Sequence, residues 1–287
     1  MDFILAKFNH LKEKNHLEAV NLMKNALIED SNNFEYRVAF GTFLCEEMDK
    51  EEGLEQLIIA ESLGELTSLT LFLMATSYLR LKEYEIAITY YERAEDDIPE
   101  AMFNIALTYT KLGDRTEAVV KLKELRKNKL YTTLAQEYII EIYLSEFRLN
   151  KVEQELKYYI KHIGETDKYH QLSGFFYFYS EINFLAVKSF FKLAGSSIPI
   201  EHYYSPLGKA LMKVGKSDRA LYYLRTNWLS TPGDYYKTVS LGECYLELKE
   251  YENAIAIAEV YIENTDDDPP QNIRPLVSRA KMALEKR

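Results

Sequence analysis

The chain has 287 residues, of which 35 are Lys or Arg and 45 are Asp or Glu, so its formal net charge is -10 at pH 7. This acidic balance disfavours non-specific attraction to nucleic-acid phosphates or anionic lipid and favours a protein partner. Hydrophobic residues make up 47% of the sequence and charged residues 28%, a composition that argues against disorder and indicates an ordered, mostly helical protein.

The chain carries no signal for secretion, membrane insertion or metal binding. Its first ten residues, MDFILAKFNH, have no long apolar core, and no run approaches the roughly 20 apolar residues of a membrane span. Cys45 and Cys244 lie far apart without a CxxC spacing, which predicts neither a disulfide framework nor a zinc site. We therefore expect a cytoplasmic protein without cofactor or metal, provided that the chain is complete.

Small and large side chains recur at fixed spacing. Ala75, Tyr78, Ala87, Tyr91 and Ala94 follow one another in a single stretch. The same order returns 31 residues later and otherwise at steps of 34 residues in both directions. The copies begin their pattern at Lys7, Gly41, Ala75, Ala106, Ile140, Gly174, Gly208 and Gly242. This regularity predicts eight tandem copies of one helical hairpin.

The pattern resembles the tetratricopeptide repeat family, whose unit is a helix-turn-helix of 34 residues. The family's tryptophan is missing at the start of every first helix, and Lys7 occupies a small site. The resemblance implies an all-α, right-handed superhelical solenoid that forms a single domain over residues 1–287. The expected repeats are 1–33, 34–67, 68–98, 99–132, 133–166, 167–200, 201–234 and 235–268, followed by a capping helix over 269–287.

Packing considerations lead to the same architecture. Two antiparallel helices would approach most closely at Ala75 and Ala87, and Ala94 would admit the following helix. Tyr78 and Tyr91 lie three or four residues further along the same faces and would fill the wedge between these contacts. Each hairpin leaves one flank unburied for the next hairpin to cover, so the last one needs a capping helix, with Leu276 and Ala280 facing inward.

Three local features depart from a regular array. The third copy is three residues short, which leaves Pro99 at the first position of the next helix. Pro206 falls inside an expected first helix, which predicts a shortened helix starting near Ser205 after a loop over 195–205. That loop is either a soft point or a rigid irregular turn. Asp266–Asp268 could form a cation site, but acids at a helix N-terminus explain them better.

No residue pattern indicates catalysis. The five histidines are scattered, and the sequence contains no HExxH motif and no Gly-rich phosphate loop. We therefore predict that the protein is not an enzyme. A basic run near a predicted helix C-terminus, Lys123, Arg126 and Lys127, fits the helix dipole and is a secondary candidate for docking an acidic segment.

The resemblance places the first helix of each hairpin on the concave side of the solenoid, where the family binds a peptide or helix. Transferring those face positions predicts a partner-binding groove. It consists of Leu69, Phe72, Leu73, Phe103, Asn104, Leu107, Leu134, Tyr138, Glu141, Gln171, Phe175 and Phe178. Family members that clamp two carboxylates use Lys, Asn and Arg at such positions, of which only Asn104 is present.

The aromatic members of this set predict an apolar trough for an apolar peptide or an amphipathic helix. Alternatively, the rings pack against neighbouring first helices and fill the trough themselves. The seventh copy offers Lys209 and Lys213, and the eighth offers Glu243 and Glu247, so a ligand with an apolar middle and polar ends would suit.

The favoured hypothesis is a non-catalytic scaffold or adaptor that holds a segment of a partner protein, as a subunit of a larger complex. The alternative is a regulatory receptor for a signalling peptide that acts through a separate effector protein. An enzyme or its accessory subunit is a third reading, although no convergent titratable cluster supports it. No nucleic-acid partner is expected, and self-association through the trough is a further option.

Overall fold

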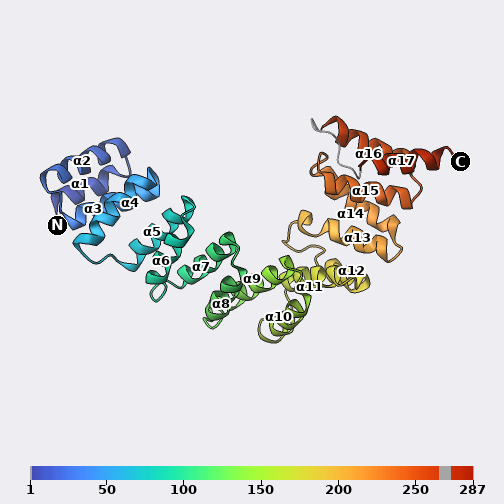
Figure 1. Cartoon of the computed structure of the whole chain (residues 1–287), viewed down its shortest axis with the longest axis horizontal. Coiled ribbons are helices and arrows are strands. Elements are labelled where there is room, and N and C mark those ends of the chain that lie inside the picture. The colour runs from blue at the N-terminus through green and yellow to red at the C-terminus, as the bar shows by residue number, and fades with distance from the viewer. Residues whose placement is uncertain (1, 265–272, 287) are drawn as a thin grey trace. The chain divides into compact units, whose positions relative to one another are not determined.

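The structure is a computed structural model that describes residues 2–264 and 273–286. These residues form seventeen α-helices and one short 3-10 helix, with no strand among them (Figure 1). The predicted all-α fold is confirmed. Asp266–Asp268 lie outside the described residues.

The helices alternate along the chain as first and second members of hairpins (Figure 1). The first helices are α1 (Phe3–Leu11), α3 (Phe34–Glu47), α5 (Ser68–Arg80), α7 (Pro99–Leu112), α9 (Thr132–Ser145), α11 (Asp167–Tyr179), α13 (Tyr204–Lys213) and α15 (Tyr235–Glu247). The second helices are α2 (His16–Glu29), α4 (Lys50–Leu63), α6 (Tyr84–Ala94), α8 (Arg115–Leu125), α10 (Leu149–His162), α12 (Asn183–Phe191), α14 (Ser217–Leu229) and α16 (Tyr251–Glu263). A last helix, α17, runs over Ile273–Leu284.

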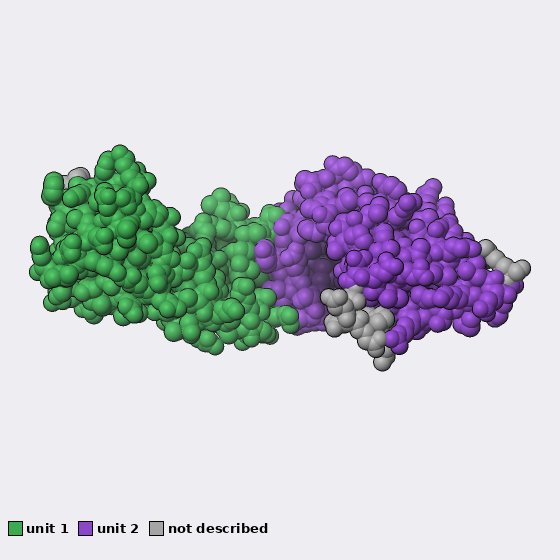
Figure 2. Space-filling model, turned by 90° about the horizontal axis from the view of Figure 1, so that it is seen from above, with its two compact units in different colours: residues 1–136 green, residues 137–287 purple. Residues whose placement is uncertain are grey.

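The chain divides into two compact units, residues 1–136 and 137–287, which Figure 2 colours separately. We call them unit 1 and unit 2, and the boundary falls inside α9. Within each unit, a first helix packs on its own second helix, and that second helix packs on the next hairpin. Examples are α3 on α4 in unit 1, and α13 on α14 and α14 on α15 in unit 2.

The small sites are where the helices approach one another most closely, as predicted. A Cβ added to Gly53 of α4 would lie 2.7 Å from the backbone nitrogen of Cys45. A Cβ added to Gly174 of α11 would lie 2.5 Å from a ring carbon of Phe190. The large sites fill the space between these contacts, and the Tyr91 and Phe190 side chains are fully buried. Glycine is therefore needed at these positions for close packing.

Many helices begin at a side chain that satisfies the exposed backbone N–H groups of the first turn. Asp49 accepts from the N–H groups of Glu51 and Glu52 at 2.9 and 3.1 Å, and Asp234 accepts from Lys237 at 2.8 Å. Pro99 occupies the start of α7, as the shortened third copy predicts.

Pro206 acts as expected on the seventh first helix. This helix, α13, has only 10 residues and begins at Tyr204, two residues before the proline. It follows a connection over 192–203 that contains the 3-10 helix Ile200–His202. The shortened helix and its late start are confirmed, whereas a soft point at this loop stays a prediction.

The last helix covers the C-terminal end of unit 2. Leu276 and Ala280 are buried, and a Cβ added to Gly242 of α15 would lie 2.6 Å from a methyl carbon of Leu276. On the outer side, Arg279 pairs with Glu243 at 2.6 Å. The inward direction predicted for Leu276 and Ala280 is confirmed.

From the third hairpin on, the turn between first and second helices has one repeated geometry. The residue in the left-handed region is Lys82 (φ 68°), Gly113 (89°), Phe147 (54°), Glu181 (60°), Gly215 (71°) or Lys249 (60°). The N–H of the next residue donates to the carbonyl five residues back, for example Arg148 to Tyr143 at 2.9 Å. This is the Schellman geometry, in which glycine is favoured because it has no Cβ.

Candidate functional site

Two cavities open beside each other on the first-helix face of unit 2. The α9–α11 cavity, about 650 Å³, lies between the ends of those helices and reaches His202. The α11–α15 cavity, about 670 Å³, is lined from α11, α13 and α15 and by the turn after α11. Tyr179 lines both, so the two cavities adjoin at this ring.

Aromatic rings form the apolar wall of the α9–α11 cavity. Phe175 packs edge-on against the buried Phe190 of its own hairpin, with ring centroids 5.5 Å apart. Tyr179 stacks on Phe175 at 6.2 Å and meets the edge of Phe147 at 5.1 Å. Phe147 is 65% exposed, so its ring stands at the cavity mouth with little support from the core.

The polar groups of this cavity are paired with one another. Lys168 forms an ion pair with Glu141 at 2.7 Å and donates to the side-chain oxygen of Gln171 at 3.0 Å. Gln171 is itself buried. The pairing fixes the polar side of the cavity and leaves the aromatic side free to contact a ligand.

The α11–α15 cavity holds an unpaired lysine. Burial lowers the pKa of Lys209, and among the described residues no hydrogen bond or ion pair is made by its ammonium group. Two carboxylates of the cavity are already engaged, because Glu243 pairs with Arg279 and Glu247 accepts from Ser217. A carboxylate supplied from outside would offset the cost of desolvating the Lys209 ammonium group.

The face residues predicted in unit 1 are mostly half-buried. Phe72 lies edge-on to the buried Tyr91 at 5.3 Å, and Leu73 also packs on this core, whereas Leu69 is 71% exposed. Phe103, Asn104, Leu107 and Leu134 are also half-buried. Rings of the predicted trough therefore pack partly on the second helix of their own hairpin, as Phe72 and Phe175 do.

The five predicted residues of unit 2 come together more closely. Glu141, Gln171 and Phe175 line the α9–α11 cavity, and Phe178 lines the α11–α15 cavity beside Tyr179. Tyr138 is half-buried on α9. Their role in binding a partner stays a prediction.

Unit 1 has a cavity of about 590 Å³ on α1 and α3, with a different chemistry. Its rings, Phe8 and Phe43, are buried in edge contact at 5.5 Å. Its rim carries Glu13, Glu46 and Glu47. This site offers carboxylates rather than exposed rings.

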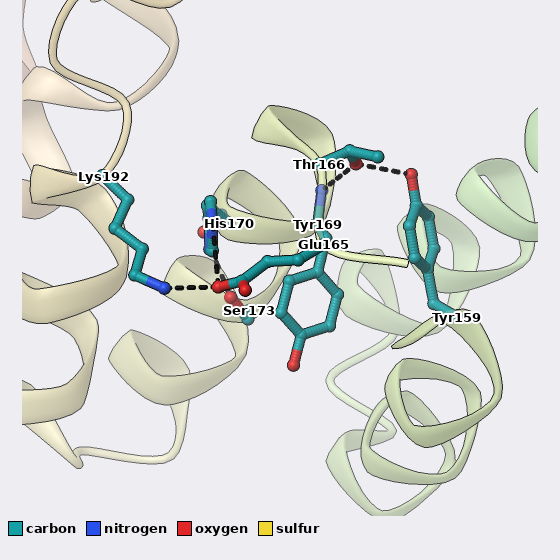
Figure 3. A network of polar contacts seen from close by, with 7 residues as sticks. All are labelled: Tyr159, Glu165, Thr166, Tyr169, His170, Ser173 and Lys192. Atoms are coloured by element: carbon teal, nitrogen blue, oxygen red, sulfur yellow. Dashed lines mark hydrogen bonds and ion pairs between the residues drawn. The ribbon is translucent and has the colours of Figure 1, made fainter. Parts of the chain in front are cut away.

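A polar network ties the start of α11 to the end of α12 (Figure 3). Figure 3 shows the Glu165 carboxylate between Lys192 and His170, with its pair to the His170 ring at 3.2 Å. The ion pair with Lys192 lowers the pKa of Glu165. Burial and, secondarily, Lys192 lower the pKa of His170, so the ring is neutral near pH 7. The network fixes the open end of the α11–α12 hairpin.

Tyr159 of α10, also drawn in Figure 3, connects its own hairpin to the start of α11. Its hydroxyl donates to Glu137 at 2.8 Å and lies 2.9 Å from the Thr166 hydroxyl. Burial raises the pKa of Tyr159 to about 12. Burial also raises the pKa of Glu137, against the effect of the tyrosine hydrogen bond.

The predicted basic strip, Lys123, Arg126 and Lys127, contributes Arg126 to a contact within unit 1. Arg126 donates to the buried side-chain oxygen of Gln136 at 2.6 Å, while Lys123 and Lys127 are exposed. Arg126 therefore stabilises the α8–α9 connection. A docking role for the strip stays a prediction.

The described part of the chain offers no group of three or more His, Cys, Asp or Glu residues that could hold a metal ion. Within the same residues, no helix has the length and apolarity needed to cross a membrane.

Phe147 is the main cavity residue that the groove prediction omitted, because it belongs to a turn and not to a first helix. Stepping 34 residues back or twice forward from it reaches Gly113 and Gly215. The other five hairpins with this turn geometry hold Gly, Lys or Glu at the same site, so a large aromatic residue there is a signal that the sequence did contain.

Comparison with known proteins identifies the repeat. Family models described as tetratricopeptide repeat match residues 70–96, 100–128 and 206–269. These stretches of both units are tetratricopeptide repeats. No curated protein sequence matches it.

Solved structures share this fold at low sequence identity. A chain of the APC/C hetero-tetramer Cut9–Hcn1 matches with a TM-score of 0.60 and 17% identity over 96% of this chain. A tetratricopeptide repeat protein from Parabacteroides merdae matches with a TM-score of 0.59 and 15% identity, over 86% of this chain and 98% of its own. Yeast Tom70 matches with a TM-score of 0.52 and 11% identity over 94% of this chain. The chain spans 55% of the matched APC/C chain and 59% of Tom70.

Proposed function

We propose that this protein is a non-catalytic adaptor that binds an apolar peptide or helix of a partner protein on its first-helix face, as a subunit of a larger complex. Tetratricopeptide repeat proteins are protein-interaction scaffolds, which supports the general class. The peptide, the complex and the absence of a catalytic or nucleic-acid role are parts of this proposal.

The observation that carries the proposal is the pair of adjoining cavities in unit 2. They are large enough for several side chains of a bound segment, and rings from α11 and from the turn after α9 form their apolar walls. Most of the polar groups in the α9–α11 cavity are already paired, so an apolar ligand group would displace little that the protein needs.

Energetics set the scale of binding. Burying three aromatic side chains in a complex gives a gross gain of about 5–9 kcal/mol. Ordering of the ligand and the loss of its translational freedom subtract from this gain. These terms limit a short segment to about micromolar affinity at best, and a longer ligand that contacts several hairpins would bind more tightly.

The test is a pulldown from native lysate, read by mass spectrometry. It compares the wild type with a Phe72→Glu, Phe103→Glu, Phe175→Glu triple variant whose fold is verified by circular dichroism. Loss of a partner from the triple variant would support the proposal. Retention of every partner would place binding elsewhere and refute it.

A control variant keeps this comparison specific. Phe184 of α12 is 70% exposed and belongs to a second helix, so Phe184→Glu changes surface charge outside the proposed face. We expect it to retain the partners. A free signalling peptide recovered in place of a protein would favour the receptor hypothesis over the adaptor.

A further inference from the structure

We propose that Phe147 is a binding residue. Its ring would pack against a large apolar side chain of the partner segment, and a carboxylate of the same segment would pair with Lys209. The inference rests on the proposed function and specifies its ligand. The favoured occupant is thus a segment that carries a large apolar residue beside an acidic one.

The first step concerns the conformation of Phe147. Its φ of 54° lies in the left-handed region, where a Cβ crowds the following carbonyl oxygen. The equivalent turns use Gly113 and Gly215 in two hairpins and Lys82, Glu181 and Lys249 in three others. A residue with a Cβ carries a conformational cost in this turn, and none of the other five turns holds an aromatic side chain.

The second step concerns what the Phe147 ring does for the fold. The ring is 65% exposed and makes an edge contact with Tyr179, which is itself 38% exposed. A ring in this position adds little to the stability of the core. Strained residues that the fold does not require are characteristic of ligand-binding sites.

The third step concerns the shape of the site. Phe147, Phe175 and Tyr179 come from a turn and from α11, and all three line the α9–α11 cavity. An inserted aliphatic or aromatic side chain would contact rings from two sides and gain their dispersion and edge interactions. Exposed rings around a concave site are typical of residues that dominate binding energy.

The fourth step concerns charge. Lys209 lies in the adjoining α11–α15 cavity, across Tyr179, and makes no ion pair with a described residue. The charge of Asp234 raises the pKa of Lys209, but by less than burial lowers it. Glu243 and Glu247 have other partners, and Glu181 is exposed at the turn. A carboxylate next to the inserted apolar side chain would find Lys209 as its counter-ion.

The test begins with selection of random 12-residue peptides, displayed on phage, against the full chain. We expect the enriched peptides to combine a large apolar residue with an Asp or Glu. A synthetic peptide with the enriched sequence is then titrated by fluorescence anisotropy against wild type, Phe147→Gly and Lys209→Met.

Phe147→Gly should weaken binding by about tenfold or more, as expected for a binding hot spot, while its thermal midpoint rises. Lys82→Gly is the matched control, since it relieves the same turn conformation outside both cavities. Its midpoint should also rise, with affinity unchanged. A change that improves the fold and damages binding cannot be attributed to unfolding.

The charge contact is tested by replacing the peptide's acid with its amide. This replacement should weaken binding to wild type by about tenfold, consistent with a charged hydrogen bond, but should not weaken binding to Lys209→Met further. Lys216→Met, which removes an exposed lysine from the α13–α14 turn, should behave as wild type.

Two results would overturn the inference and are distinguishable from each other. Enriched peptides that bind Phe147→Gly as tightly as wild type, or that show no acid dependence, would refute this ligand assignment while the adaptor function stands. Failure to enrich any peptide on the wild type would refute both.

Discussion

Unit 1 and unit 2 share one packing scheme but differ on their first-helix faces. In both, glycine or alanine sits at the helix contacts, and a large ring such as Tyr91 or Phe190 fills the space beside them. Residues 1–136 contain 24 Asp and Glu against 16 Lys and Arg, whereas residues 137–287 contain 21 against 19.

The first-helix faces of the two units differ in the same sense as their charges. The unit 1 cavity has Glu46 and Glu47 on its rim and its rings are buried, while unit 2 exposes Phe147 and Tyr179 beside Lys209. Packing restricts the contact positions in every hairpin, but it leaves the face positions free to vary. Differences in binding between the units must therefore arise on the faces.

The largest expected effect tests the shared packing. Tyr91→Ala in unit 1 and Phe190→Ala in unit 2 each remove a fully buried ring from the equivalent site. Each should lower the free energy of unfolding by about 3–5 kcal/mol, measured by urea denaturation. A loss below about 1 kcal/mol in either variant would show that the two units are not packed alike.

A smaller effect is expected at the close helix contacts. Gly53→Ala forces a Cβ to within 2.7 Å of the Cys45 backbone nitrogen, which cannot move independently of α3. The unfolding free energy should fall by about 1–3 kcal/mol, despite the better helix propensity of alanine. In the control Gly233→Ala, the added Cβ meets no atom within 4 Å. A thermal shift equal in both variants would contradict the close contact.

Glycine substitutions in the turns should raise the stability of the fold rather than lower it. Lys82→Gly in unit 1 and Phe147→Gly in unit 2 each place glycine in a left-handed conformation. Both should gain up to about 1 kcal/mol, because relief of the Cβ contact exceeds the added freedom of the unfolded chain. Denaturant midpoints would measure this gain. A loss of stability in Phe147→Gly alone would mean that its ring supports the fold.

The smallest effect is a pH dependence specific to unit 2. Burial lowers the pKa of His170 below its ordinary 6.5, so the folded state binds this proton less readily than the unfolded state. Its contribution to stability is present above pH 6.5 and is lost as the pH falls through the folded pKa. His170→Gln should therefore lose less stability than wild type between pH 7 and pH 5, as measured by thermal unfolding.

Other charged groups around His170 do not reverse the direction of its pKa shift. Lys192 also lowers the pKa of His170, whereas Glu165 and Asp167 raise it by less than the combined lowering. Tyr169 and Lys188 line the same small site, and burial raises the pKa of Tyr169, so this ring adds no charge over this pH range. An unchanged pH slope in His170→Gln would show that the ring titrates alike in both states.

Much of the fold could be predicted from the sequence, because the repeat spacing specifies which positions pack. Ala75 and Ala87 are small where helices meet, Pro99 begins a helix, and Pro206 delays one. The extent of a single solenoid over all residues and the repeat boundaries stay predictions.

The candidate site could be predicted less well. Spacing places Phe72 and Phe175 on a face, but it does not say how far each ring leans onto its own second helix. The conformation of a turn is likewise invisible in the pattern of small and large residues, so Phe147 was omitted. Cavities depend on such tilts and turns rather than on periodicity.

The central claim is that a partner segment lies on the first-helix face of unit 2. The most direct test replaces Tyr179 or, as the control, Phe184 with the photo-crosslinking residue benzoylphenylalanine, then irradiates the chain in native lysate. Both positions are exposed, at 38% and 70%, but only Tyr179 lines the cavities. We predict covalent adducts with a partner from position 179 and none from position 184. Adducts from position 184 alone, or from neither position, would contradict the claim.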